Sequence, residues 1–207
     1  MPKIVDHDAR REEIARIACE VVAAHGFEHA TVARIAAAAG YTTGMIAHYY
    51  ESKQQIILAG LRLMLKRIED RLTHQRGHDG AGLLGVLSEA LPLDERRFAE
   101  CAFWMAFWGR VSADKEVRRL NAWVHREYLR VYARCFALHW PASTDWPKRV
   151  RDEALRSVVT FINGLTASVV TSPADWPPAT QVAQLRLQLD MLRVRAETRT
   201  PRAAAQS

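Results

Sequence analysis

Apolar residues recur along almost the whole chain at intervals of three and four positions, which is the spacing of one face of an α-helix. No stretch alternates apolar and polar residues between hairpin turns, as a half-buried strand would. The pattern therefore predicts an all-α protein. Punctuation by glycine, proline and capping residues places the helices at about 8–25, 31–40, 42–49, 52–76, 81–90, 94–110, 113–139, 148–171 and 179–196.

Single residues indicate where the first helices start and stop. Gly26 and Gly40 follow the first two helices, and glycine is the usual residue just past a helix C-terminus. The hydroxyl of Thr31 is placed to cap the second helix, while Ser52 and Gln55 form an S-x-x-Q capping box for the fourth. The N-terminal part is therefore expected to hold three short helices before a long one.

The helix lengths also predict how the chain is organised into domains. The three short helices indicate a small domain over residues 1–53, and the fourth helix connects it to a bundle of longer ones. A Gly-His-Asp-Gly break at 77–80 separates this connecting helix from the bundle. We predict a second domain over residues 54–196 and a flexible tail over residues 197–207.

The composition is that of an ordinary soluble domain, with 207 residues, of which 49% are hydrophobic and 25% charged. No run approaches eighteen apolar residues, and the N-terminal residues lack an apolar stretch of signal-peptide length. We therefore expect a cytoplasmic protein that binds no membrane. The cysteines at positions 19, 101 and 135 are widely separated, which favours buried free thiols over disulfides or a zinc site.

The formal net charge of +6 suggests a nucleic-acid partner only weakly, because the excess is spread along the chain. Residues 193–207 carry four arginines and one glutamate, so half of the excess lies at the C-terminal end. Residues 1–76 carry 11 Lys and Arg against 9 Asp and Glu. The charge by itself therefore decides nothing about function.

A local pattern is more informative than the charge. A two-helix DNA-reading unit needs a small residue where its helices cross, a glycine at the turn and an apolar residue on the second helix. Ala36, Gly40 and Ile46 meet these three needs in the right order. The residues expected to close the small core around them are Val32, Ile35, Met45 and Tyr49. Tyr50 is interpreted as a core residue rather than a DNA contact.

The second helix of this unit would present a surface of short side chains to a DNA groove. Thr43 is a candidate for base contacts, and Gly44 would allow the backbone to approach a phosphate closely. Further phosphate contacts are expected from His48 and Lys53, aided by backbone N–H groups where helices begin. The full predicted DNA-binding set is Thr31, Arg34, Tyr41, Thr42, Thr43, Gly44, His48, Tyr49 and Lys53.

The segment from Thr31 to Lys53 resembles the signature of tetracycline-repressor-like (TetR) transcriptional regulators. The likeness rests on Ile35-Ala36, Ala39-Gly40, Thr42, Gly44, His48-Tyr49-Tyr50 and Ser52-Lys53. Tyr50 stands where the family usually has Phe, and Thr43 stands where many members have Lys. The second difference removes a cation from the predicted DNA surface and leaves base readout open.

The resemblance implies an architecture and a mode of action. Residues 1–53 would form a helix-turn-helix DNA-binding domain, and residues 54–196 a domain for ligand binding and dimerisation. The homodimer would form through the helices at 148–171 and 179–196 and bind a palindromic double-stranded DNA operator. A small-molecule inducer would release it, so that the protein acts as a repressor.

A dense set of aromatic residues in the second half of the chain has two interpretations. Spacings of three and four are typical of a helical core, but rings of this kind also form cages for quaternary ammonium ligands. As a ligand site, the set is Glu100, Phe103, Trp104, Phe107, Trp108, Trp123 and Tyr128. Residues 103–108 also resemble the choline-sensing (BetI-like) subgroup, which implies a cationic inducer. A neutral hydrophobic or aromatic inducer is an equal alternative.

No enzymatic function is predicted. The eight histidines form no H-E-x-x-H, and the chain has no G-x-S-x-G, no phosphate-binding glycine loop and no Cys-x-x-Cys. We therefore expect no cofactor and no metal. The alternative to a DNA-binding regulator is a helical small-molecule-binding or adaptor protein without sequence-specific DNA binding.

Overall fold

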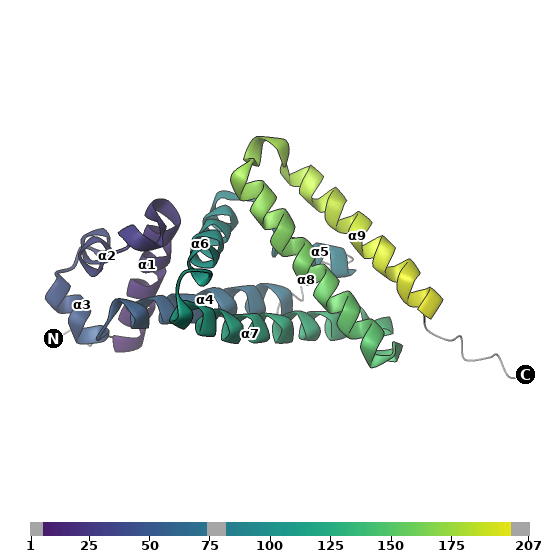
Figure 1. Cartoon of the computed structure of the whole chain (residues 1–207), viewed down its shortest axis with the longest axis horizontal. Helices are drawn as coiled ribbons and strands as arrows, with labels where there is room; N and C mark the ends of the chain where they lie inside the picture. Colours follow the sequence, from purple (N-terminus) through teal and green to yellow (C-terminus); the bar gives the residue numbers. More distant parts are fainter. Residues whose placement is uncertain (1–5, 74–81, 200–207) are drawn as a thin grey trace, which may run out of the picture. The chain divides into compact units, whose positions relative to one another are not determined.

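The computed structural model describes residues 6–73 and 82–199, and it shows helices and connecting turns with no strand in these two ranges (Figure 1). The all-α prediction is confirmed. The α-helices are α1 (His7–His29), α2 (Val32–Ala39), α3 (Thr43–Tyr49), α4 (Lys53–Thr73), α5 (Gly82–Ser88), α6 (Glu95–Val111), α7 (Lys115–His139), α8 (Lys148–Thr171) and α9 (Pro178–Arg199). The predicted break at residues 77–80 and residues 200–207 of the predicted tail lie outside the described residues.

Several boundaries differ from the predicted ones. Gly26 interrupts α1 as predicted, with a positive φ of 77° that glycine adopts without strain, but a further helical segment continues from there to His29. At the other end of the chain, α9 continues to Arg199, so residues 197–199 are helical and not part of a tail. Two short 3₁₀ helices, η1 (Pro141–Asp145) and η2 (Pro173–Asp175), lie at proline-containing breaks that were predicted only as interruptions.

The described helices pack as two compact units, one over residues 6–67 and 98–124 and one over 68–73, 82–97 and 125–199. The first unit includes the start of α4, which packs against α1, and the division of function after residue 53 stays a prediction. A side chain at Gly60 of α4 would place its Cβ 2.6 Å from Cys19 Sγ of α1. The close approach of the two helices therefore depends on glycine, and it joins the start of α4 to the N-terminal helices.

In the first unit, the core forms where α1, α2, α3 and α4 meet. Ile14, Ile35 and Ile46 are fully buried, one from each of α1, α2 and α3. Ile56 and Leu61 contribute the buried face of α4. Because each of these helices buries only one apolar stripe, the opposite faces of α2 and α3 remain exposed.

The second unit is dominated by the neighbouring helices α8 and α9, which Figure 1 shows as a pair joined at η2. Each of the two helices buries one apolar stripe. The stripes consist of Val158, Val159, Ile162, Leu165 and Val169 on α8, and Leu185, Leu189 and Leu192 on α9. The start of α9 is fixed by Gln181, whose Nε2 donates to the carbonyl oxygens of Trp176 at 2.9 Å and Pro92 at 3.4 Å.

The three cysteines are buried free thiols, as expected. Burial raises the pKa of the Cys19 and Cys135 thiols to about 12, so both stay protonated and unreactive near neutral pH. Within the described ranges, no group of three or more His, Cys, Asp or Glu residues could hold a metal ion. One described helix, α8, is long and apolar enough to cross a membrane by length and composition, a test that core helices of soluble proteins also pass.

Candidate DNA-binding surface

The turn between α2 and α3 is held by side-chain caps and one glycine. Thr31 Oγ1 accepts a hydrogen bond from the Arg34 backbone N–H at 3.2 Å, which caps α2. Gly40 has a φ of 69°, the left-handed conformation that ends a helix. Thr42 then caps α3, because its Oγ1 accepts from the Met45 N–H at 3.1 Å. The orientation of α3 is therefore set before any DNA is bound.

The small core predicted between α2 and α3 is present, with Ile35 and Tyr49 buried as expected, but Val32 is only half-buried and Met45 lies outside it. Ala36 is 2% exposed and Ile46 is fully buried, so a larger residue at position 36 would separate the helices. Met45, which was predicted to close this core, is instead 36% exposed. Tyr50 is buried as predicted, and its hydroxyl donates to the Arg11 carbonyl oxygen at 2.8 Å.

The outer face of α3 carries the short polar side chains that the sequence placed there. Thr42, Thr43, Gly44 and His48 are all exposed. A side chain at Gly44 would meet only Thr42 Oγ1, at 3.9 Å, so the backbone at this position is open to approach. On the neighbouring helix, Arg34 is also exposed, and its Nη1 donates to the His29 carbonyl oxygen at 3.2 Å. Thr42, Thr43 and Gly44 are therefore accessible at the start of α3, as are His48 near its end and Arg34 on α2.

Two predicted DNA contacts are engaged inside the protein. Tyr49 is only 7% exposed, and its ring lies 5.5 Å from the His7 ring and 5.4 Å from the His48 ring. The Lys53 ammonium donates to the Phe27 carbonyl oxygen at 2.7 Å and lies 5.0 Å from the Phe27 ring centroid. Burial lowers the pKa of Lys53 below its usual value. Lys53 thus joins the start of α4 to the end of α1 in this structure.

Tyr41 is anchored to α1 by residues that sequence reasoning did not single out. Its hydroxyl donates to Glu13 Oε2 at 2.8 Å and accepts a hydrogen bond from Arg10, and Arg10 also pairs with Glu13 at 3.0 Å. The hydrogen bond from Tyr41 is the main cause that lowers the pKa of the Glu13 carboxyl. Arg10 and Glu13 lie on α1 about thirty positions away, so no local motif could have revealed them.

The predicted ligand residues are divided between the two compact units. Glu100, Phe103, Trp104 and Phe107 are buried in the first unit, where the Trp104 ring packs edge-to-face on both phenylalanine rings. Glu100 Oε1 pairs with Arg67 Nη1 at 3.5 Å, so its carboxylate already has a cationic partner. This packing favours the core interpretation of these rings, and their role in ligand binding stays a prediction.

The other three predicted ligand residues are less buried. Trp108 and Trp123 are partly exposed in the first unit, and the Arg62 guanidinium lies 5.9 Å from the centroid of the Trp123 ring. Tyr128 belongs to the second unit, where its ring lies 4.8 Å from that of Tyr132 and its hydroxyl accepts from the Tyr132 hydroxyl at 3.2 Å. The residues predicted as one aromatic patch are therefore not one packed cluster within a single unit.

A capped two-helix unit whose second helix is exposed, followed by a body of long helices, defines the class of helix-turn-helix regulators. Two family models match the chain: "Bacterial regulatory proteins, tetR family" over residues 14–59, and "BetI-type transcriptional repressor, C-terminal" over residues 80–194. The chain therefore belongs to the TetR family of bacterial transcriptional regulators, with a BetI-type C-terminal region. Because this is a family of regulators and not of enzymes, the prediction of no enzymatic function is confirmed.

Individual relatives agree with this assignment. The chain is 30% identical over 120 residues to the transcriptional regulator PksA of Bacillus subtilis, covering 56% of this chain and 58% of that protein, so it spans less than two thirds of that relative. It is 26% identical over 186 residues to the regulator BetI of Escherichia coli, covering 86% and 92%. A regulator from Saccharomonospora viridis, solved in complex with choline, has the same fold with a TM-score of 0.71 and 19% identity, covering 88% and 96%.

Proposed function

We propose that the protein is a homodimeric repressor that binds a palindromic operator through α3 and is released by a small-molecule inducer. The observation that carries the proposal is the exposed, pre-oriented start of α3 at Thr42, Thr43 and Gly44. Helix N-termini with free backbone N–H groups and short side chains fit into the major groove and against phosphates. As a TetR-type regulator of this kind, the protein would act in the cytoplasm.

The contacts on DNA divide by chemistry. Thr43, the first residue of α3, is the candidate for base recognition, because a hydroxyl can donate to or accept from base edges. Arg34 on α2 and His48 near the end of α3 are the candidates for phosphate contacts, together with backbone N–H groups at the start of α2 after Thr31. Lys53 and Tyr49 are engaged inside the first unit. We therefore propose that in the free protein they position α2 and α3.

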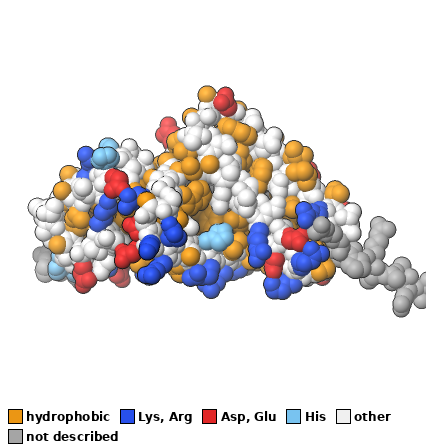
Figure 2. Space-filling model, in the orientation of Figure 1, with side chains coloured by type: hydrophobic (Ala, Val, Ile, Leu, Met, Phe, Trp, Pro, Cys, Tyr) orange, Lys and Arg blue, Asp and Glu red, His pale blue; other side chains and the backbone are white. Residues whose placement is uncertain are grey.

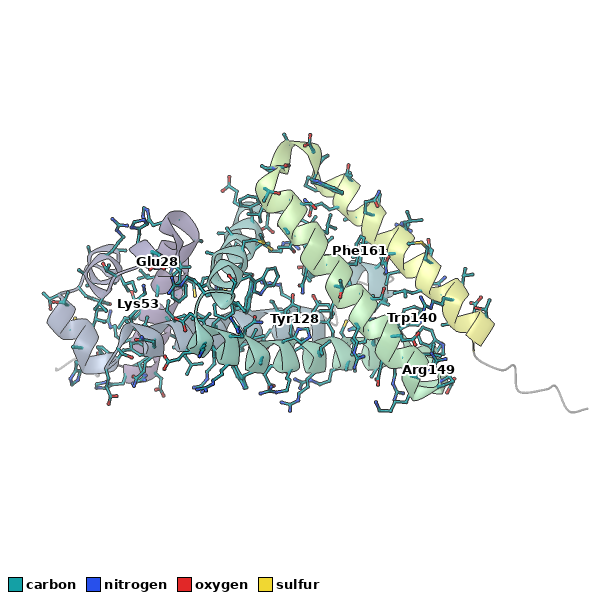
Figure 3. The ribbon with its side chains drawn as sticks, in the orientation of Figure 1. Glu28, Lys53, Tyr128, Trp140, Arg149 and Phe161 are labelled. Carbon is teal, nitrogen blue, oxygen red and sulfur yellow. The ribbon has the colours of Figure 1, made fainter. Side chains whose placement is uncertain are left out.

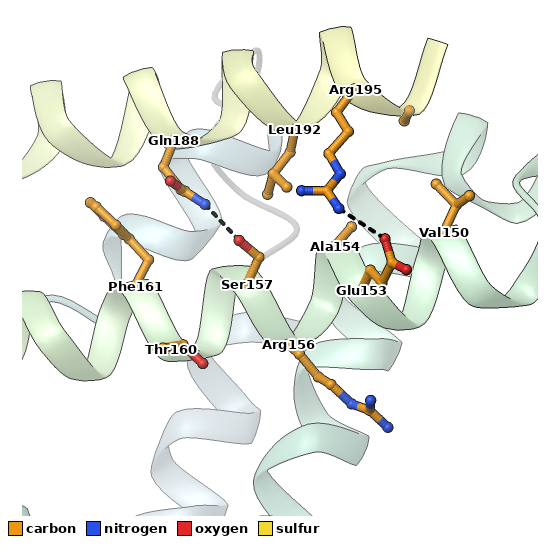
Figure 4. A pocket seen from close by; sticks show the side chains of 11 residues that line it. Val150, Glu153, Ala154, Arg156, Ser157, Thr160, Phe161, Gln188, Leu192 and Arg195 are labelled. Carbon is orange, nitrogen blue, oxygen red and sulfur yellow. Dashed lines mark hydrogen bonds and ion pairs between the residues drawn. The ribbon is translucent and has the colours of Figure 1, made fainter. Parts of the chain in front are cut away.

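The dimer is proposed to form along α8 and α9, where a groove of about 510 Å³ lies between the two helices (Figure 4). Its sides are held together by two polar contacts: Gln188 Nε2 donates to Ser157 Oγ at 2.8 Å, and Arg195 pairs with Glu153 at 3.1 Å. Phe161 is partly exposed at one end of this groove. A partly open apolar groove in the middle of a polar rim is suited to a second copy of the same surface.

The exposed apolar residues of α9 support the proposal that the dimer forms along α8 and α9. Leu187 and Met191 are each 53% exposed and Val194 is 61% exposed, and hydrophobic side chains are visible along α9 in Figure 2. Only 39% of the most apolar part of α8 is buried within this chain. Because a contiguous apolar surface is rarely left in water, a second copy would bury it. Two reading helices would then lie roughly 34–36 Å apart, one turn of DNA.

Release by an inducer would follow from linkage. In one conformation of the dimer, the two copies of α3 would be wrongly spaced for the operator. A ligand that binds this conformation more tightly lowers operator affinity, and the size of the effect is set by the ratio of its affinities for the two conformations. The BetI-type C-terminal region and the choline bound by the Saccharomonospora regulator support a quaternary ammonium inducer. The buried aromatic rings equally suit a neutral aromatic one. Adding choline to the protein–operator complex in a gel-shift titration decides between them.

The proposal is tested on DNA segments next to the gene that encodes the protein. We expect a palindromic segment to be shifted in a gel, with affinity that falls on the order of 10³-fold between 50 and 200 mM salt, as several phosphate contacts require. An unrelated duplex of equal length is the control. Equal affinity for both duplexes, with little salt dependence, would instead support a ligand-binding or adaptor protein.

We expect Thr43→Ala to change which operator variants are preferred, because a hydroxyl that reads bases is lost. Arg34→Ala is expected to weaken binding to all sequences by similar factors, since phosphate contacts carry no sequence information. The measurement is a competition gel-shift with operators changed one base pair at a time. Thr144→Ala, which removes an exposed hydroxyl in the second unit, is the matched control. If Thr43→Ala leaves all preferences unchanged, α3 does not read bases at this position.

We also expect Tyr41→Phe and Glu13→Gln to weaken operator binding by similar factors of roughly 2–10, the worth of one hydrogen bond. Each change breaks the contact that orients Tyr41, so the double variant should lose little more than either single one. Glu12→Gln is the matched control, because Glu12 is an exposed neighbour with the same charge. Fully additive losses would mean that the two residues act on DNA separately.

A further inference from the structure

A cavity of about 350 Å³ lies within the first compact unit, and it shares no lining residue with the groove of α8 and α9. It is bordered by the end of α1 and the start of α4 on one side, and by the end of α6 and the start of α7 on the other. Figure 3 labels two of the lining residues, Glu28 at the end of α1 and Lys53 at the start of α4. Its volume is within the range of small-molecule sites.

The cavity combines an apolar wall with a few polar groups. Phe107 is fully buried and Ile57 is 3% exposed, while Leu58, Val117 and Leu120 are partly exposed where they line the cavity. Apolar walls with few convergent polar groups are the usual composition of sites that bind small organic molecules. The body of a ligand here would therefore be apolar.

The charges around the cavity nearly balance. Two cationic side chains, Lys53 and Arg110, line it together with three carboxylates, from Glu28, Asp114 and Glu116. Arg110 pairs with Glu28 and lies 3.6 Å from Asp114, so most of this charge is already compensated. A charged ligand would face a like charge at short range, and a neutral ligand would not.

The polar group that such a ligand needs is indicated by Arg110. Its Nε–H is buried and has no hydrogen-bond acceptor in the described part of the chain. A buried donor without an acceptor is costly, and an oxygen of a bound molecule would satisfy it. The Lys53 ammonium donates to the Phe27 carbonyl oxygen and has further N–H groups. One of these could donate to the same ligand oxygen as Arg110 Nε–H. The two donors lie on opposite sides of the cavity, on α4 and α6.

We propose that this cavity is a second effector site, which binds a neutral molecule with an apolar body and a carbonyl or ether oxygen. The oxygen would accept from Arg110 Nε–H and draw the Lys53 ammonium away from the Phe27 carbonyl oxygen. That contact joins the end of α1 to the start of α4. Its loss would therefore change the position of α2 and α3, which lie between α1 and α4 in the sequence. This second step rests on the proposed DNA-binding function, whereas ligand binding does not.

Binding is tested with Prodan, a neutral naphthalene that carries a propionyl carbonyl and whose fluorescence shifts to the blue in apolar surroundings. We expect saturable binding to the full-length protein at one site per chain. Leu58→Trp, which fills the cavity from α4, should weaken binding at least tenfold. Leu83→Trp is the matched control, because Leu83 lines a different cavity beside Trp140, and it should change binding less than twofold.

A second wall and the polar contact are tested separately. Val117→Phe fills the cavity from α7 and should weaken binding in the same way, which keeps the test valid if Leu58→Trp fails to fold. Arg110→Met should weaken binding of Prodan but not of dimethylaminonaphthalene, which lacks the carbonyl. The site is excluded if Prodan shows no saturable binding. It is also excluded if filling the cavity from α4 or α7 in a folded variant weakens binding no more than Leu83→Trp does.

The coupling to DNA is tested on the operator complex. We expect saturating Prodan to lower operator affinity about fivefold or more in the wild type and not in Leu58→Trp, and operator DNA to lower Prodan affinity by the same factor. If Prodan binds but operator affinity does not change, the proposed effector role is wrong, while the proposed binding site still stands. Failure of the protein to bind DNA at all would contradict the proposed function, while the fluorescence result would still decide the site.

Discussion

Replacing Phe107 by alanine is expected to lower the free energy of unfolding by about 3–5 kcal/mol, the usual loss for a fully buried phenylalanine. Phe107 is 0% exposed, and its ring packs edge-to-face on Trp104 with centroids 6.1 Å apart. The variant would lose both the transfer free energy of the ring and the contacts around the space that it leaves. Chemical denaturation followed by far-ultraviolet circular dichroism measures this difference.

Trp108→Ala is the matched control, since Trp108 is the next residue of α6 and is partly exposed. We expect a smaller loss of stability from it, because less apolar surface leaves water when this side chain folds. The pair decides between the two interpretations of the aromatic residues. A folded, fully stable Phe107→Ala protein that no longer responds to its inducer would mean that Phe107 is a ligand residue and not part of the core.

The double variant Leu187→Glu, Met191→Glu is expected to be monomeric and to bind the operator about 100-fold more weakly, or worse. Both side chains are 53% exposed, so their replacement should leave the fold of the single chain intact. They lie one turn apart on α9, and Met191 is one turn from Gln188 and Arg195, which line the groove next to α8. In a two-fold symmetric dimer, the double variant would bring four carboxylates together at the interface. These carboxylates would repel one another, and removing them from water would cost free energy.

The loss in operator affinity follows from bivalence. A dimer places its second reading helix next to the second half-site once the first is bound, and this raises the overall affinity by about 10²–10⁴ without new contacts. Sedimentation equilibrium and gel-shift titration measure the two effects. Leu138→Glu is the control, because Leu138 is 56% exposed on α7 and should leave both unchanged. A double variant that remains dimeric would show that α9 does not form the interface.

The local parts of the DNA-binding surface could be predicted from the sequence because each depends on neighbouring residues. The cap at Thr31, the turn at Gly40 and the cap at Thr42 all link atoms within a few positions of one another. The Ser52–Gln55 pair is similar, since Ser52 Oγ accepts from the Gln55 N–H at 3.2 Å. Such contacts form in any chain that has these residues in this order, whatever the rest of the fold.

Contacts between distant parts of the chain could not be predicted in this way. Lys53 is predicted to contact a DNA phosphate, and no local pattern indicated that in the free protein its ammonium contacts the carbonyl oxygen of Phe27, twenty-six positions earlier. Met45 was expected in the core and is partly exposed, because the small core closes without it. Whether the aromatic residues form a core or a ligand site also stayed open, because helical spacing shows which residues share a face but not which helix that face meets.

By itself, the sequence determined the helical class, most helix boundaries, the motif from Thr31 to Lys53 and the family that this motif indicates. These follow from periodicity, capping and short spacings, which act over one or two helical turns. Only the tertiary structure decided that Tyr41 is anchored by Arg10 and Glu13, and that Arg110 pairs with Glu28. It also decided that a cavity is lined by Arg110, Glu28 and residues at the start of α7. These depend on how helices far apart in sequence pack, which no local pattern records.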